Sequence, residues 1–175
     1  MVQSDSKRMR PCELYLVRHA IAAERGDDWP DDTKRPLTAD GVSRFREVVE
    51  GLAWFGVGLD EIYSSPLIRT RQTADLLAAG LDPSPAVRLL DSLAPGHQPT
   101  DVLAEVAKRV KRRRIALVGH EPDLGQLAAA LIGAQRALPF RKGGVCRIDV
   151  DRLGASATGS LIWFLPPKVL RKAGR

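Results

Sequence analysis

The sequence has few cysteines and contains no long hydrophobic run. Its two cysteines, Cys12 and Cys146, lie far apart in the 175 residues and are not accompanied by a second pair. This pattern implies neither a disulfide framework nor a zinc site, and each thiol is expected to be a small buried side chain in or beside a strand. No apolar run approaches the roughly 20 residues that a membrane-spanning helix needs. Residues 1–10 also lack the apolar stretch of a secretion signal, so we expect a cytoplasmic protein with reduced thiols and no membrane contact.

Aromatic residues are also scarce, at 5% of the chain, whereas basic residues are in excess and give a formal net charge of +6. The basic run at 108–114 has no interleaved aromatic side chains on which nucleic-acid bases could stack. We therefore expect no nucleic-acid binding and interpret the run as the end of a helix, where cations complement the helix dipole. The excess positive charge would also favour phosphorylated partners through long-range steering.

The length predicts one domain over residues 1–175, which is large enough to bury roughly 70% of the surface of its unfolded chain. Residues 1–11 and 168–175 are expected to be flexible ends. We expect a monomer, because the predicted helices show no additional apolar face that a second copy would cover.

Strand-like and helix-like segments alternate along the chain, which predicts an α/β fold built in layers. Strands are expected over 12–17, 60–64, 86–90, 115–118, 144–150 and 158–165, and helices over 40–55, 66–79, 100–112 and 122–133. Pro66 and Pro122 suit the first turn of their helices, and Thr100 suits an N-cap. The last two strands flank a turn at 151–154 and indicate an antiparallel pair at one side of the sheet.

An apolar run from Leu14 to Val17 ends abruptly in the pair Arg18-His19. An imidazole can act as a nucleophile and take up a phosphoryl group. A guanidinium beside it can hold the oxygens of that group in a planar, two-pronged contact. The alternative interpretation is a strand that simply reaches water and becomes polar, and this segment alone does not decide between the two.

Three further segments supply side chains that suit the same chemistry. One is the stretch at 62–74, where Arg69 follows a short strand, and another is the stretch at 115–122, where His120 ends an apolar strand. The third is the loop sequence at 35–41, which begins with Arg35. Because parallel strands bring their carboxyl ends to one edge of a sheet, these basic side chains are expected to meet there. Two helix N-termini would face the same crevice, so the site would suit a dianion.

Taken together, these motifs resemble the histidine phosphatase superfamily, whose hallmark is an Arg-His-Gly strand end followed by a distant Ser-x-x-x-Arg-x-x-Gln-Thr and a Gly-His pair. With its short length and its Gly-His-Glu-Pro motif, the chain is most similar to the compact SixA-type phosphohistidine phosphatases. The resemblance runs from about Leu14 to Pro167. It implies a phosphoglycerate mutase-like fold, a three-layer α/β/α sandwich whose mostly parallel sheet carries an antiparallel edge.

The resemblance also implies roles for the basic residues. His19 would be the nucleophile that forms a phosphohistidine intermediate, and Arg18, Arg69 and His120 would hold the equatorial oxygens of the phosphoryl group. Arg35 would reach the pocket from its loop or, as an equal alternative, form a structural ion pair with Asp31 or Asp32. Ser65 is expected to orient a core residue through its hydroxyl. His97 would line the pocket rim or be an exposed loop residue.

The histidines show no metal-ligand spacing and no cluster of carboxylates stands out, so we expect no metal and no cofactor. Two departures from the family pattern matter. Ala20 replaces a glycine, which requires a backbone there with negative φ. A general acid is not evident, because the corresponding region offers only Asp91, whose alignment is uncertain. An alkoxide leaving group needs a proton, whereas a protonated phosphohistidine releases a neutral imidazole.

The preferred hypothesis is therefore a cofactor-independent phosphatase that acts on protein phosphohistidine, with a phosphotransfer domain as its partner. The short insertion at 22–34 would leave the pocket open, which suits a substrate carried on a protein. One alternative is a phosphatase or mutase for a small phosphorylated metabolite. The other is a non-catalytic module that binds phosphate.

Overall fold

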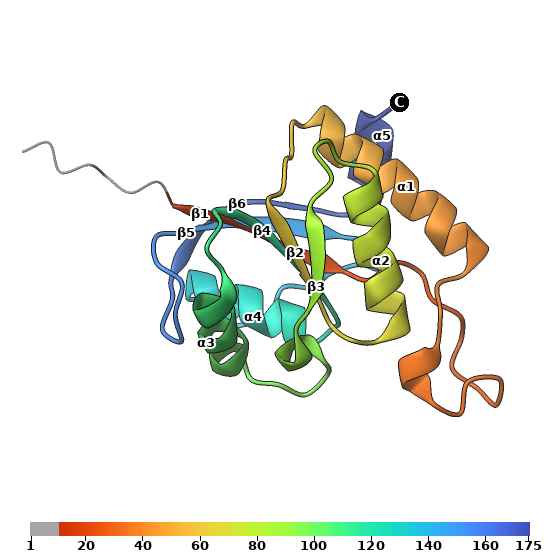
Figure 1. Ribbon diagram of the computed structural model, residues 1–175, viewed down its shortest axis with the longest axis horizontal. Coiled ribbons are helices and arrows are strands. Elements are labelled where there is room, and N and C mark those ends of the chain that lie inside the picture. Colours follow the sequence, from red (N-terminus) through yellow and green to blue (C-terminus); the bar gives the residue numbers. More distant parts are fainter. Residues whose placement is uncertain (1–10) are drawn as a thin grey trace, which may run out of the picture.

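The computed structural model describes residues 11–175, in which one mixed sheet separates two layers of helices (Figure 1). The strands are β1 (Cys12–Arg18), β2 (Glu61–Ser64), β3 (Ala86–Leu89), β4 (Arg114–Gly119), β5 (Val145–Val150) and β6 (Gly159–Leu165). They lie in the order β3-β2-β4-β1-β5-β6. The first four strands in this order are parallel, and β5 and β6 add an antiparallel edge next to β1. This confirms the expected α/β fold with a mostly parallel sheet.

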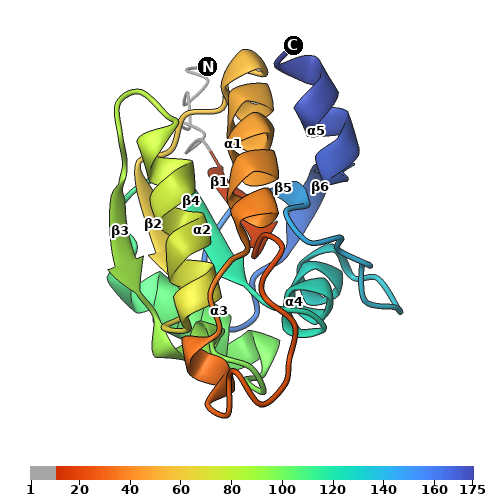
Figure 2. The ribbon, with the colours of Figure 1, turned by 90° about the vertical axis from the view of Figure 1, so that its right-hand side faces the viewer.

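The helices cover the two faces of the sheet unequally. They are α1 (Ala39–Trp54), α2 (Ile68–Ala79), α3 (Pro99–Arg109), α4 (Asp123–Ile132) and α5 (Pro167–Ala173), with 3-10 turns η1 (Asp32–Lys34) and η2 (Asp91–Leu93). Residues of α1, α2 and α5 share one buried cluster with the sheet, and residues of α3 and α4 share the other. Figures 1 and 2 show these two groups of helices on opposite faces of the sheet.

The alternation of side chains along β1 explains how the sheet serves both layers. Leu14 and Leu16 pack against α3 and α4, whereas Tyr15 and Val17 pack against α1, α2 and α5, and all four are at most 3% exposed. Successive residues of a strand point to opposite faces, so a strand that is buried on both sides is apolar at every position. Burying each such side chain contributes about 1.5–3 kcal/mol.

Three strands end at the same edge of the sheet. Arg18 is paired with Gly119 in the register of β1 and β4, and Ser64 is paired with Val118 in the register of β2 and β4. The residues that follow these strand ends, His19, Ser65 and His120, are therefore delivered to one edge, as expected for parallel strands.

Three helix starts differ from the sequence-based expectations. Pro66 and Pro122 both precede their helices, because α2 begins at Ile68 after an extended Leu67 and α4 begins at Asp123. The hydroxyl of Ser65 accepts the N–H of Leu67, which forms a turn where the first helical residues were expected. In α3 the N-cap is Gln98 rather than Thr100, since Pro99 with its fixed φ occupies the first helical turn.

The basic run at 108–114 is also divided differently. Helix α3 ends at Arg109, and Arg114 already belongs to β4. Arg109 pairs with Glu105 at 2.7 Å, and Arg114 pairs with Asp60 at 2.7 Å. The run therefore connects a helix to a strand and is only partly the helix end that was expected.

The expectation that residues 168–175 form a flexible end is wrong. These residues belong largely to α5, which packs on α1 and completely buries Leu170. Gly51 allows this contact, because a Cβ at that position would lie 2.0 Å from the carbonyl oxygen of Leu170. Arg171 and Arg175 both pair with Glu47 of α1, at 3.1 and 2.8 Å. Of the other expected flexible end, residues 1–10 lie outside the described residues.

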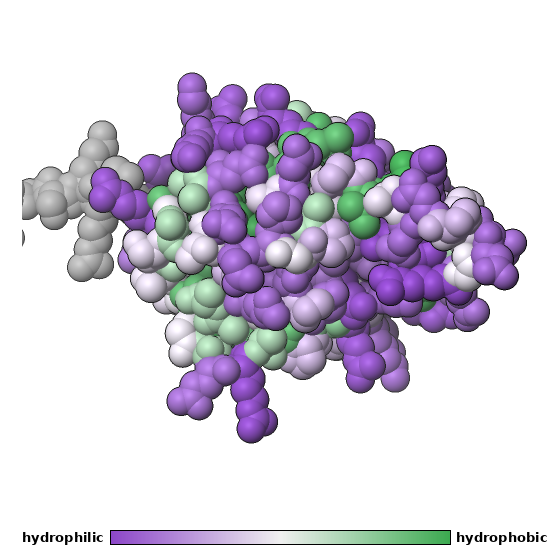
Figure 3. Space-filling model, turned by 90° about the horizontal axis from the view of Figure 1, so that it is seen from below, coloured by the Kyte–Doolittle hydropathy of each residue, from purple (hydrophilic) through white to green (hydrophobic). Residues whose placement is uncertain are grey.

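Within residues 11–175, no helix is long and apolar enough to cross a membrane. Both cysteines are free thiols, with Cys146 buried and Cys12 half-buried. The face of the molecule in Figure 3 is mostly hydrophilic, including the end at the right, where Figure 1 places the segment before α1.

Candidate active site

A cleft of about 410 Å³ lies at the edge of the sheet where the parallel strands end. The basic side chains that line it come from separate elements and include all five predicted site residues: Arg18, His19, Arg35, Arg69 and His120. Lys142, from the loop before β5, lines it as well. The structure therefore brings together predicted site residues that are up to 102 positions apart in the sequence, from Arg18 to His120, and Lys142 is 22 positions further along the chain.

His19 is 6% exposed and its ring orientation is set by a short local contact. Its Nδ1 lies 2.7 Å from the carbonyl oxygen of Ala20. A carbonyl oxygen can only accept, so in the neutral ring Nδ1 carries the hydrogen and Nε2 keeps its lone pair. The N–H of Ala20 donates to the Thr73 hydroxyl at 3.1 Å, which fixes this turn to α2. No non-glycine residue in the described chain has positive φ, so the backbone suits alanine at position 20, as expected.

A loop from Phe140 to Gly144 supports the end of β1, and the sequence analysis missed it. Arg18 donates through Nη1 to the carbonyl oxygen of Phe140 at 2.7 Å. The N–H of Gly143 lies 3.1 Å from the carbonyl oxygens of both Arg18 and His19. Gly143 has φ of +77°, a conformation that favours glycine. The Gly143-Gly144 pair was the available signal for this turn.

Asp32 gathers three arginines at the other side of the cleft. Its carboxylate lies 3.0 Å from Arg69 Nη2, 2.8 Å from Arg35 Nε and 3.2 Å from Arg25 Nε. Its backbone carbonyl also accepts a bond from Arg69 Nη1 at 2.8 Å. Figure 2 shows the segment that carries η1 beside the start of α2. The two alternatives for Arg35 are thus both realised, because it pairs with Asp32 and lines the cleft.

Two motif residues on α2 have structural roles. The side-chain oxygen of Gln72 accepts the N–H of Leu37 at 2.8 Å, and the Thr73 hydroxyl donates to the carbonyl oxygen of Arg69 at 2.7 Å. The Gln72 bond joins α2 to the loop after Arg35, and the bond from the Ala20 N–H to the Thr73 hydroxyl joins α2 to the turn after His19. They hold the separate parts of the cleft in register.

His120 is 4% exposed and contacts Ser65, as the expected orienting role of Ser65 requires. The Ser65 hydroxyl lies 2.9 Å from His120 Nε2 and accepts the N–H of Leu67 at 3.4 Å. Among the described residues the hydrogen of the Ser65 hydroxyl has no acceptor other than Nε2, so we assign it to that atom, which leaves the hydrogen of the neutral ring on Nδ1. The rings of His19 and His120 lie 5.3 Å apart, centroid to centroid.

Three residues that line the cleft each have one buried nitrogen atom without a hydrogen-bond partner among the described residues: Arg18 Nε, Arg69 Nε and His120 Nδ1. Each is a donor in the protonation states inferred above. Leaving a buried donor unpaired costs about 1–3 kcal/mol, so a ligand that supplies acceptor oxygens would recover part of that cost. The arrangement can therefore bind a small oxyanion beside His19.

Burial keeps both histidines neutral at pH 7. Burial, followed by the nearby charges of Arg69 and Arg18, lowers the pKa of His19 to about 4, although its bond to Ala20 opposes this. Burial and the charge of Arg69 lower the pKa of His120 to about 3. A neutral His19 can act as a nucleophile at neutral pH, because its Nε2 lone pair is available.

These shifts predict that the folded protein keeps both rings neutral to low pH. Nitrogen-15 NMR of the imidazoles should show no protonation of His19 or His120 between pH 8 and about pH 5.5, whereas the unfolded chain should titrate near ~6.5. The unfolded state then binds more protons, so the free energy of unfolding should fall as pH decreases from ~6.5 to about 4. A midpoint near 6.5 for either ring in the folded protein would contradict the buried geometry.

Two other candidates do not enter the cleft. Asp91 is exposed in η2 and does not line it. His97 is exposed in its loop and lines a small separate hollow that it shares with His120. The carboxyl groups that line the cleft are instead those of Glu24 and Glu121. Glu24 is exposed, whereas burial raises the pKa of Glu121, although the charge of Arg18 opposes this. Within residues 11–175, no three His, Cys, Asp or Glu side chains are grouped so that they could hold a metal ion.

The model of the histidine phosphatase superfamily (branch 1) matches residues 14–94. An uncharacterized protein of Picosynechococcus sp. is 38% identical over 165 residues, covering 90% of this chain and 98% of its own. Phosphohistidine phosphatase SixA of Escherichia coli is 24% identical over 163 residues, which cover 92% of this chain and 98% of SixA. Among solved structures, the protein histidine phosphatase SixA complexed with tungstate matches with a TM-score of 0.77 and 23% sequence identity. The match covers 90% of this chain and 99% of the SixA chain.

Proposed function

The chain belongs to the histidine phosphatase superfamily and is a phosphatase, and we propose that it hydrolyses phosphohistidine on a protein through a covalent intermediate at His19. The observation that carries this proposal is the free Nε2 of His19, which lines a cleft together with three residues that each have an unpartnered buried nitrogen atom. A nucleophile and donors for phosphoryl oxygens are the groups that this chemistry needs.

In the first step, Nε2 of His19 attacks the phosphorus atom. A bond forms between Nε2 and phosphorus, and the bond from phosphorus to the leaving nitrogen breaks. The unpartnered donors of Arg18, Arg69 and His120 would hold the phosphoryl oxygens, where charge is present throughout the transfer. Water then attacks the phosphohistidine, which releases inorganic phosphate and returns the electron pair to Nε2.

The positions of Asp91 and Glu24, two of the carboxyl groups considered as general acids, support a phosphohistidine substrate. Asp91 does not line the cleft, and Glu24 is exposed at its rim. When a protonated phosphohistidine is cleaved, its imidazole departs as a neutral ring and needs no general acid. An alkyl phosphate instead releases an alkoxide, which must be protonated. The similarity to SixA, a phosphohistidine phosphatase by name, points to the same substrate class.

A small phosphorylated metabolite is the second candidate, and one observation favours it. The carboxyl group of Glu121 lines the cleft and has a pKa raised by burial, so it would retain a proton more readily than an exposed glutamate. Such a group could protonate a departing alkoxide. The two candidates therefore predict different substrate preferences.

Direct competition between substrates tests the proposal. The protein is incubated with a phosphohistidine-bearing phosphotransfer domain, a phosphoserine peptide and several sugar phosphates, and kcat/KM is measured for each. We expect the phosphohistidine domain to be preferred by about tenfold or more. A preference for sugar phosphates would support the metabolite candidate, and phosphate release from none of the substrates would leave a binding module as the explanation.

A further inference from the structure

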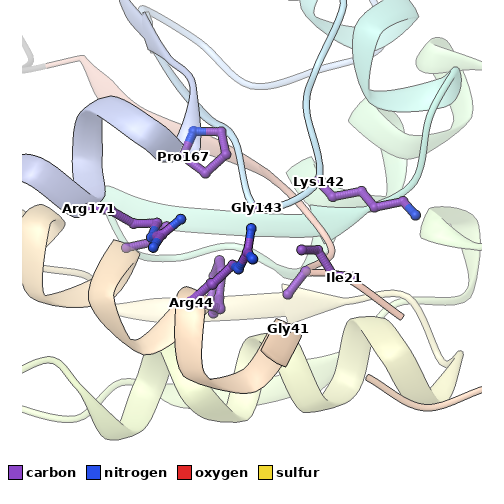
Figure 4. A pocket seen from close by; sticks show the side chains of 10 residues that line it. Ile21, Gly41, Arg44, Lys142, Gly143, Pro167 and Arg171 are labelled. Atoms are coloured by element: carbon purple, nitrogen blue, oxygen red, sulfur yellow. The ribbon is translucent and has the colours of Figure 1, made fainter. Parts of the chain in front are cut away.

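A second hollow, of about 70 Å³, lies next to the catalytic cleft between α1, α5 and the loop before β5 (Figure 4). Phe45 and Val48 of α1, both 1% exposed, contribute apolar surface to it. Ile21 and Pro167 add further apolar surface from the turn after β1 and from the start of α5. No part of this hollow is used by the reaction at His19.

The hollow adjoins the catalytic cleft at Lys142, which lines both. Ala20 and Ile21, which follow His19 directly, form part of its wall. The charge of Lys142 also reaches His19, since it contributes to the lowered pKa of that ring. A polypeptide advances about 3.3–3.6 Å per extended residue, so a chain bound at His19 could reach the hollow within a few residues.

The charged side chains that line the hollow are all cationic: Arg44, Lys142 and Arg171. Figure 4 shows Arg44 and Arg171 at one side of it and Lys142 at the other. Arg44 and Arg171 bind Asp40 and Glu47 through Nε, at 2.8 and 3.1 Å, which leaves N–H groups of each guanidinium available. Lys142 has no ion pair among the described residues.

We propose that this hollow is a docking subsite for the phosphorylated protein, which inserts a short aliphatic side chain that is flanked by a carboxylate. A cavity measured in this way holds a water molecule from about 10–15 Å³ upward, so the hollow of about 70 Å³ has room for a short aliphatic side chain. The cationic rim selects an acidic neighbour by charge complementarity. This inference rests on the proposed function, because it assumes a protein-borne substrate.

The test removes two charges from the rim without touching the catalytic cleft. The double variant R44Q/R171Q is compared with R46Q/R175Q, which makes the same charge change. Arg46 lies on α1 near Arg44, and Arg175 pairs with the same Glu47 as Arg171, but neither lines the hollow. For the phosphohistidine-bearing phosphotransfer domain, KM should rise about 3- to 10-fold in R44Q/R171Q and change less than about twofold in R46Q/R175Q.

The same variants are assayed with p-nitrophenyl phosphate, which occupies the catalytic cleft alone. Its kcat/KM should stay within about twofold of the unaltered protein in both variants, and their thermal unfolding should coincide. If the two variants have equal KM for the protein substrate, the docking proposal is wrong while the proposed function stands. If the unaltered protein does not hydrolyse the phosphotransfer domain at all, the proposed function itself fails.

Discussion

Replacement of His19 by alanine is expected to lower phosphatase activity by about 10⁴-fold or more, because the variant loses the nucleophile and no other imidazole can take its place. His120, the neighbouring ring, keeps its Nε2 on the Ser65 hydroxyl, and its Nδ1 has no hydrogen-bond partner among the described residues. It is therefore placed to donate to oxygen rather than to attack phosphorus. The release of inorganic phosphate under single-turnover conditions measures the loss.

A covalent intermediate at His19 also predicts a difference in phosphate labelling between the unaltered protein and His19→Ala. Acid-labile, alkali-stable phosphate should be trapped on the unaltered protein after rapid quenching with base, and it should be missing from His19→Ala. His97→Ala is the matched control, because His97 is exposed and does not line the cleft. Equal labelling of His19→Ala and the unaltered protein would exclude His19 as the nucleophile.

Replacement of Asp32 by asparagine is expected to lower kcat by about 10- to 100-fold, although Asp32 is expected to contact no substrate. Its carboxylate holds Arg69 and Arg35 at 3.0 and 2.8 Å, and Arg69 is 3% exposed, with Nε left for the phosphoryl oxygens. Without the carboxylate the like charges of Arg69 and Arg35 repel one another, and a displacement of about 1 Å in a positioning group can cost about 10²-fold.

Kinetic constants separate this effect from general loss of structure. In Asp32→Asn, inhibition by inorganic phosphate should be undiminished, because the change removes a negative charge from the site while kcat falls. Asp31→Asn is the control, since Asp31 caps η1 and pairs with Lys34 at 3.5 Å without contacting an arginine. Parallel losses of kcat and phosphate affinity, or equal behaviour of the two variants, would contradict the role assigned to Asp32.

Much of the fold was readable from local patterns. The alternation of apolar strands and amphipathic helices predicted each strand of the sheet to within one or two residues. Helix α5 was not predicted because it is only seven residues long, has Pro166 and Pro167 at its start and is rich in basic residues. Its single completely buried side chain, Leu170, gives no periodic signal, and contacts with Gly51 and Glu47 of α1 stabilise it as a helix.

The candidate site was predicted through residues that directly follow apolar strands, such as His19 and His120. The residues that support them were not found in this way. Asp32 precedes Arg69 by 37 positions, and the Phe140 carbonyl that receives Arg18 lies 122 positions further along the chain. Such contacts depend on the register of the sheet and on the course of loops, which short-range sequence patterns do not report.

The amino-acid sequence by itself determined the layered α/β architecture and the set of basic side chains at the strand ends, because hydrophobic periodicity is a local property of the chain. Only the tertiary structure decided that Nε2 of His19 has the free lone pair, that Asp32 pairs with three arginines, and that Lys142 lines both the cleft and a second hollow. Hydrogen-bond direction and ion pairing require atoms within about 3 Å of one another, and that proximity arises only when distant segments are folded together.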